Sequence, residues 1–205
     1  KGELQDVIDG NFPTVHSPNP EEPAALELAI ELAKEKGAQL VMGTDPDADR
    51  VGIAIPDKSG EVVLLNGNQT GSLLVNYLLT RWKELGKITG KEFVAKTVVT
   101  TNLLDVMATA KGVKVYNTLT GFKHIGAKIK ALEGKEQFIG GGEESYGYLA
   151  GDFVRDKDAV MSCALIAEMV AWAKNKGKNL FDLMQEMYME HGFYLDQLRL
   201  QLGEV

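Results

Sequence analysis

The chain has 205 residues, of which 44% are hydrophobic and 25% are charged, a composition typical of globular domains. Its formal net charge of −7 argues against a nucleic-acid partner, and no run reaches the ~18 apolar residues that indicate a membrane-spanning helix. The single cysteine, Cys163, excludes an intrachain disulfide and fits a cytoplasmic setting. We therefore expect one large or two small domains with no nucleic-acid and no membrane partner.

The first 65 residues predict a helix followed by three short strands. Residues 1–18 are irregular, and a helix is expected from Asn19, a capping residue before Pro20, to Gly37, with Pro23 as an alternative start one turn later. Strands are expected at about 39–43, 51–55 and 61–65, with a hairpin turn at 57–60.

The most informative stretch is GTDPDADR, at residues 43–50 between the first two expected strands. In an extended or turning backbone, side chains two apart point the same way, so Asp45, Asp47 and Asp49 can converge on one cation. Mg²⁺ is the expected ion because it prefers oxygen ligands and takes the remaining ones from water and phosphate. Arg50 adds a fixed positive charge suited to a phosphate.

Three other interpretations of this acidic loop compete with a Mg²⁺ site. An EF-hand would need glycine at its sixth position and a carboxylate at its twelfth, where this chain has Arg50 and Pro56. An aspartyl phosphatase would use Asp45 as nucleophile beside Asp47, but leaves Asp49 and Arg50 unexplained. A solvated acidic turn without a ligand is the third alternative.

The pattern changes near residue 66 from a hairpin to alternating strands and helices. Such alternation indicates an α/β fold with parallel βαβ units and helices on both faces of the sheet. The expected division is therefore one domain at 1–65, a second at 66–190 and a tail at 191–205. Helices are expected near 70–85, 102–111, 121–132, 157–175 and 179–190, and strands near 93–99, 113–116 and 137–139.

Two polar loops follow strands of the second part, at 117–124 and 140–147. Ligands of open parallel sheets bind at the carboxyl ends of the strands, where these loops lie. The glycines at 140–142 are expected to open the second loop and let a ligand approach the backbone. Glu143 and Ser145 can point together and hold sugar hydroxyls. The alternative is a glycine-rich turn whose glutamate caps a helix.

A charged stretch precedes the apolar helix expected at 157–175. Asp156 is a candidate cap for that helix, while Arg155 and Lys157 can face a phosphate. Taken alone, this stretch fits a solvated, charged helix start better than a binding site.

Taken in order, several stretches resemble the α-D-phosphohexomutases, the phosphoglucomutase and phosphomannomutase enzymes. They are TDPDADR at 44–50, TLTGFK at 118–123, GEESYG at 142–147, VRDKDA at 154–159 and SPNPE at 17–21. The resemblance covers nearly the whole chain. It implies two α/β/α-type domains with mixed to mostly parallel sheets, namely a partial family domain 2 and a domain 3.

The family's activity, as the resemblance implies it, moves a phosphoryl group between the C1 and C6 hydroxyls of a hexose phosphate. A phosphoserine and a bisphosphate intermediate carry the phosphoryl group. By this resemblance Asp45, Asp47 and Asp49 hold Mg²⁺, and Arg50 neutralises charge on the transferring group. The implied sugar-phosphate contacts are Glu143, Ser145, Thr120, Gly121, Lys157 and Arg155.

The resemblance also implies that family domains 1 and 4 lie outside this chain. The phosphoserine loop of relatives reads Thr-Ala-Ser-His-Asn-Pro, whereas HSPNP at 16–20 has that composition in another order and is interpreted as the start of the first helix. The chain begins with Lys1, which fits a piece of a longer protein, and we expect it to be inactive alone. A Mg²⁺-dependent aspartyl phosphatase and a non-catalytic sugar-phosphate-binding module remain the alternatives.

Overall fold

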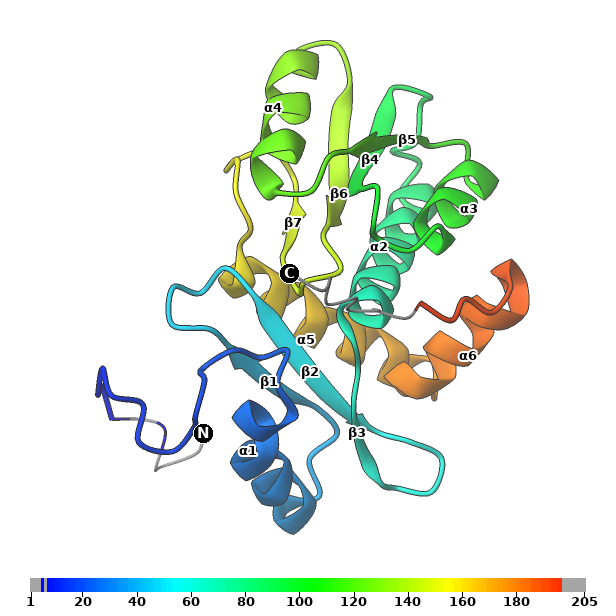
Figure 1. Ribbon diagram of the computed structural model, residues 1–205. Helices are drawn as coiled ribbons and strands as arrows, with labels where there is room; N and C mark the ends of the chain where they lie inside the picture. The colour runs from blue at the N-terminus through cyan, green and yellow to red at the C-terminus, as the bar shows by residue number, and fades with distance from the viewer. Residues whose placement is uncertain (1–4, 6, 197–205) are drawn as a thin grey trace, which may run out of the picture.

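The computed structural model of the protein describes residue 5 and residues 7–196 (Figure 1). Two sheets are present in this part of the chain, one of three strands and one of four. The expected tail at 191–205 lies partly outside the described residues. None of the described helices is long and apolar enough to cross a membrane.

The first sheet is an antiparallel meander in the order β1-β2-β3. It consists of β1 (Val41–Thr44), β2 (Val51–Pro56) and β3 (Val62–Leu64), and the expected turn at 57–60 joins the last two. Helix α1 (Pro23–Lys36) covers one face of this sheet, at the bottom of Figure 1. The small apolar cluster between them contains Leu26, Ala33, Val41 and Ala54.

Helix α1 begins at Pro23, the later of the two starts that the sequence allowed. Its N-cap is Glu22, which makes no side-chain capping bond, and Pro23 occupies the first turn. Proline lacks an N–H and breaks a helix interior, so a helix that contains Pro23 has to begin there. Asn19 instead accepts a hydrogen bond from the Glu21 N–H at 3.1 Å and forms a turn just before the helix.

The second sheet has the strand order β5-β4-β6-β7. Strands β4 (Glu92–Thr97), β5 (Lys114–Thr118) and β6 (Gln137–Gly142) are parallel, while β7 (Tyr148–Ala150) is antiparallel to β6. The helices of this part are α2 (Gly67–Glu84), α3 (Leu103–Ala110), α4 (Phe122–Leu132), α5 (Ala159–Asn175) and α6 (Leu180–His191).

Helices cover both faces of the second sheet, as the sequence predicted. Phe93 and Ala95 of β4 pack with α4, whereas Val94 between them packs in the cluster formed by α2, α3, α5 and α6. Alternate residues of a strand point to opposite faces, so one strand supplies both cores. Figure 1 shows α4 alone on its side of the sheet.

The glycine run at 140–142 does not open a loop, contrary to the sequence expectation. It continues strand β6 to Gly142, and the turn that follows leads into β7, which the sequence did not reveal. A Cβ atom on Gly141 would lie 1.8 Å from the carbonyl oxygen of Ala95 in the neighbouring strand. Glycine is therefore required here for close approach of two strands rather than of a ligand.

Two helix starts refine the expected boundaries. Asn66 caps α2 with a reciprocal capping box to Gln69, which extends this helix to Gly67. Asp158, not Asp156 as expected, caps α5 by accepting from the Met161 N–H at 2.8 Å. The carboxylate of Asp156 accepts instead from the adjacent Lys157 N–H.

Both parts of the chain contribute to one apolar core. Val51, Ile53 and Ile55 of β2 belong to the same buried cluster as residues of α2, α5 and α6. Helices α2 and α5 contact β2 on one side and strands of the second sheet on the other. This shared core fixes the position of the first sheet against the second.

We expect Ile53→Ala to lower the free energy of unfolding by about 2–5 kcal/mol, because Ile53 is fully buried in the shared core and its truncation leaves a cavity. The matched control is Ile8→Ala, the same change at a fully exposed side chain, for which we expect less than about 0.5 kcal/mol. Urea unfolding monitored by circular dichroism measures both, and equal effects would contradict the shared core.

Candidate functional site

The acidic loop at 45–50 and the turn at 143–147 meet through backbone hydrogen bonds. The N–H of Val51 donates to the carbonyl of Tyr146 at 3.1 Å, and Arg50 forms an antiparallel bridge with Gly147. The N–H of Ala159, at the start of α5, donates to the carbonyl of Ala48 at 3.0 Å. Two loops about a hundred residues apart thus form one continuous surface.

The three aspartates of the acidic loop converge, as their spacing predicts. One carboxylate oxygen each of Asp45, Asp47 and Asp49 lies within 4.8 Å of the other two. Asp45 is the most enclosed, with 11% of its side chain exposed, and its Oδ1 accepts from the N–H groups of Asp49 and Arg50 at 3.0 Å each. An all-oxygen donor set of this kind fits a hard divalent cation such as Mg²⁺.

Two side-chain cations flank the aspartates. The Arg50 guanidinium lies 3.8 Å from Asp45 and 3.7 Å from Asp49, and its Nη1 donates to Glu21 at 2.8 Å. The Lys157 ammonium lies 2.8 Å from the Asp49 carboxylate. Lys157 therefore reaches from the segment before α5 to the acidic loop, a contact that no local pattern in the sequence indicates.

The surroundings shift the pKa values of two of these groups. Burial raises the pKa of Asp45, and the nearby Asp49 carboxylate adds to the rise, which the Arg50 N–H opposes. Burial acts to lower the pKa of Lys157, but its hydrogen bond to Asp49 and the charge of that carboxylate outweigh burial, so the pKa is raised. Lys157 is therefore fully charged at neutral pH.

Glu143 joins the two polar loops of the second sheet. It is only 8% exposed, and its carboxylate accepts from the N–H of Gly121, the residue before α4, at 2.9 Å. Burial raises the pKa of Glu143, while the Gly121 N–H and the charge of Lys157 oppose that rise. Thr120, exposed, precedes Gly121, and the half-buried Ser145 lies in the same turn as Glu143.

Glu144, which sequence reasoning did not single out, anchors this turn to the end of β4. Its carboxylate accepts from the hydroxyls of Thr97 and Thr100 at 3.0 Å each. These threonines belong to the end of β4 and the turn after it, more than forty residues away in the chain. No local pattern in the sequence signals such a pairing.

The contacts of Arg155 lie in its own loop and at the end of α4, not at the aspartates. Its guanidinium donates to the carbonyls of Asp152 and Val154 in its own loop and lies 3.4 Å from Glu133, at the end of α4.

Each of the two loops holds one non-glycine residue in the left-handed region of the backbone. Ala48 has φ of 55° and Tyr146 has φ of 67°. Side chains disfavour this region, and such strain concentrates at functional sites. The Tyr146 carbonyl accepts from the Val51 N–H and so joins the two loops, whereas the Ala48 carbonyl accepts from the Ala159 N–H and ties the acidic loop to the start of α5.

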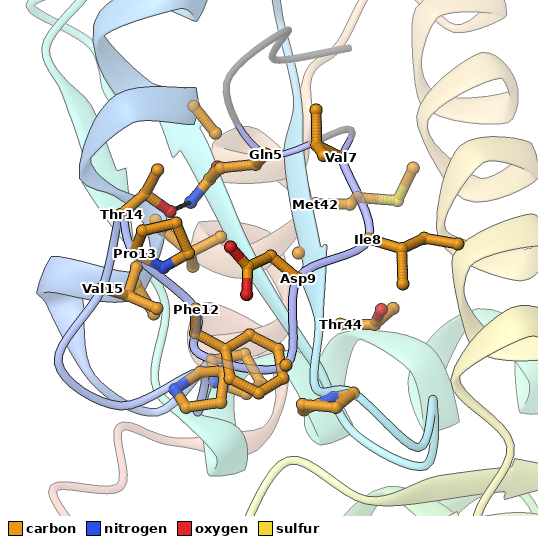
Figure 2. Close-up of a pocket in the computed structure, with 18 residues that line it drawn as sticks. Gln5, Val7, Ile8, Asp9, Phe12, Pro13, Thr14, Val15, Met42 and Thr44 are labelled. Carbon is orange, nitrogen blue, oxygen red and sulfur yellow. Dashed lines mark hydrogen bonds between the residues drawn. The ribbon is translucent and has the colours of Figure 1, made fainter.

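A hollow of about 850 Å³ lies beside the acidic loop, between the N-terminal segment, α1 and β1 (Figure 2). Asp9 is the only charged side chain among the described residues that line it. Its carboxylate accepts hydrogen bonds from the backbone N–H and the side-chain amide of Asn11. Asp45, Asp47, Asp49 and Glu143 do not line this hollow. The charged side chains of the candidate site therefore gather where the two loops meet, not in the hollow.

Family models match almost the whole chain. The model described as "Phosphoglucomutase/phosphomannomutase, alpha/beta/alpha domain II" matches residues 2–60, and the one described as "domain III" matches residues 66–191. The chain is 42% identical over 195 residues to a phosphoglucomutase of Staphylococcus haemolyticus and 40% identical over 190 residues to one of Staphylococcus aureus. It covers 35% and 34% of those proteins, and they cover 95% and 93% of it.

Solved structures agree with these matches. A candidate phosphomannomutase from Thermus thermophilus has a TM-score of 0.68 at 28% identity, over 85% of this chain and 36% of that one. The fold also resembles Aspergillus fumigatus N-acetylphosphoglucosamine mutase in complex with GlcNAc-6P and magnesium, with a TM-score of 0.53 at 14% identity, over 78% and 39% of the two chains.

The chain thus spans about a third of the length of the curated relatives it matches. The acidic loop joins two strands rather than two helices, which removes the EF-hand interpretation. By its loops, its fold and these matches, the chain belongs to the phosphoglucomutase/phosphomannomutase family of phosphohexomutase enzymes.

Proposed function

We propose that this chain supplies the metal-binding and sugar-binding part of a phosphohexomutase that acts on hexose phosphates. The observation that carries the proposal is the backbone junction between the acidic loop and the turn of Glu143, joined by the Val51–Tyr146 hydrogen bond. A bound cation and a bound sugar would therefore lie next to each other. The proposed domains are 1–65 and 66–190, a division supported by family matches at 2–60 and 66–191.

In this proposal Asp45, Asp47 and Asp49 hold Mg²⁺, as their convergent oxygens allow. The ion would supply charge stabilisation for phosphoryl transfer from a phosphoserine outside this chain to a sugar hydroxyl and back. The magnesium complex of the fold relative from Aspergillus fumigatus supports this choice of ion. Arg50, held between two of the aspartates and Glu21, is oriented by these contacts to neutralise the transferring group.

The sugar hydroxyls would bind to Glu143 and Ser145, with Thr120 and Gly121 shaping the pocket. The Gly121 N–H holds one oxygen of Glu143 in place, which leaves the other oxygen to accept from a sugar hydroxyl. The positive charge of Lys157 acts on Glu143, so Lys157 is placed to contact a bound sugar phosphate. Arg155 would need to leave its contacts with Glu133 and with its own loop to reach a substrate.

The aspartyl phosphatase alternative is disfavoured by the environment of Asp45. Its Oδ1 accepts two backbone hydrogen bonds, so the side chain is anchored rather than free to attack a phosphate. A cytoplasmic location remains a prediction from the sequence.

The activity is tested with this chain and with the complete reading frame that contains it. We expect the complete protein to convert glucose 1-phosphate to glucose 6-phosphate in the presence of Mg²⁺ and a bisphosphate activator. We expect no turnover from this chain alone, because the phosphoserine would come from another domain. Turnover by the chain alone, or none by the complete protein with glucose or mannose phosphates, would contradict the proposal.

Binding of Mn²⁺, followed by electron paramagnetic resonance, tests the metal assignment. We expect Asp47→Asn to weaken binding by about tenfold or more, since it removes one of three charged ligands. The control Asp152→Asn removes the same charge from an exposed loop position and should leave the Kd unchanged. Equal Mn²⁺ affinities in the two variants would contradict the assignment of the metal to this loop.

The variant Glu143→Gln tests whether the buried charge of Glu143 lowers the free energy of unfolding. Because burial raises the pKa of Glu143, the wild-type chain loses stability as pH rises from the unfolded-state pKa through the raised folded-state value. The glutamine variant has no such loss and keeps a side-chain oxygen for the Gly121 N–H. Urea unfolding should therefore show a larger stability advantage for the variant at pH 7 than at pH 4, and the opposite order would contradict this assignment.

A further inference from the structure

Lys157 spans the two loops of the site. It lies one residue before Asp158, the cap of α5, and 16% of its side chain is exposed. Its ammonium reaches the acidic loop, 2.8 Å from the Oδ2 of Asp49. Its aliphatic stem lies over Gly147, where an added Cβ would come within 2.1 Å of the Lys157 Cδ. The absence of a side chain at Gly147 thus opens the path along which the lysine reaches Asp49.

We propose that Lys157 is an internal counter-ion of the acidic loop, which competes with a divalent cation for Asp49 and thereby couples that loop to the turn of Glu143. The inference rests on the proposed function, because it takes the three aspartates as the metal site. It concerns the chain's own charges and applies to a cation with or without a sugar phosphate.

The competition follows from the chemistry of one carboxylate. Asp49 offers its oxygens both to the Lys157 ammonium and to any cation bound among the aspartates. Two positive charges within a few ångströms of each other in a half-buried site repel strongly, so each lowers the affinity of the other for Asp49. An ammonium on a four-carbon stem can rotate away, whereas two backbone N–H groups hold the Asp45 carboxylate in the loop.

The coupling follows from what else faces the ammonium. The carboxylates whose charges act on Lys157 are Asp49, Asp156 and Glu143. When a cation takes over Asp49, the buried Glu143 is the partner that lies within the site. An ammonium that shifts toward Glu143 adds positive charge beside the residue proposed to hold the sugar and moves over Gly147 of the same turn.

Mn²⁺ alone, titrated into this chain and followed by electron paramagnetic resonance, tests the competition. We expect Lys157→Met to bind Mn²⁺ about tenfold more tightly than wild type, equivalent to about 1.4 kcal/mol. Lys157→Arg keeps the charge and should stay near the wild-type Kd. Lys174→Met removes one charge from the last turn of α5, roughly 22 Å along the helix and beyond the screening length at physiological salt, and should also leave the Kd unchanged.

Hydrogen exchange of the amides at 143–147, with and without Mg²⁺, tests the coupling. We expect Mg²⁺ to change exchange in the wild-type chain and in Lys157→Arg, but not in Lys157→Met. Circular dichroism melting checks that each variant is folded.

The outcomes separate this inference from the proposed function. Equal or weaker Mn²⁺ binding by a folded Lys157→Met overturns the counter-ion role and leaves the metal site standing. Exchange at 143–147 that does not respond to Mg²⁺ in the wild-type chain overturns the coupling. Failure of every variant and of the wild type to bind Mn²⁺ overturns both the inference and the metal assignment.

Discussion

The site depends on a short backbone junction between two loops. The hydrogen bond from Val51 to Tyr146 and the bridge between Arg50 and Gly147 hold the acidic loop against the turn of Glu143. The apolar core that β2 shares with α2, α5 and α6 holds the two sheets in the relative position that these bonds need. Without that constraint the acidic loop and the turn of Glu143 would be separate features, and one site could not include both.

The junction also explains where charge accumulates. Arg50 and Lys157 lie near Asp45 and Asp49, and the charges of both cations also act on Glu143. Burial raises the pKa of both Asp45 and Glu143, so the site holds carboxylates at the expense of stability. Enzyme sites commonly contain such stored electrostatic cost, which a bound ion or substrate relieves.

Local patterns in the sequence predicted the parts of the structure that depend on neighbouring residues. The convergence of Asp45, Asp47 and Asp49 was expected and is observed, although a turn closed by the bond from the Ala48 N–H to the Asp45 carbonyl produces it rather than an extended backbone. Helices on both faces of the second sheet follow from the alternation of strands and helices. The contacts of Lys157 with Asp49 and of Glu144 with Thr97 join distant residues and left no local signal. The prediction that the glycines at 140–142 open a loop was wrong, because glycine is required both where two strands approach closely and where a ligand approaches the backbone.

The most direct test of the account is a manganese anomalous-difference map from crystals of this chain grown with Mn²⁺. We expect one peak enclosed by the carboxylates of Asp45, Asp47 and Asp49, with Lys157 moved away from Asp49. A peak elsewhere on the chain, or no peak at the acidic loop at saturating Mn²⁺, would contradict the claim that the two loops form one metal-dependent site.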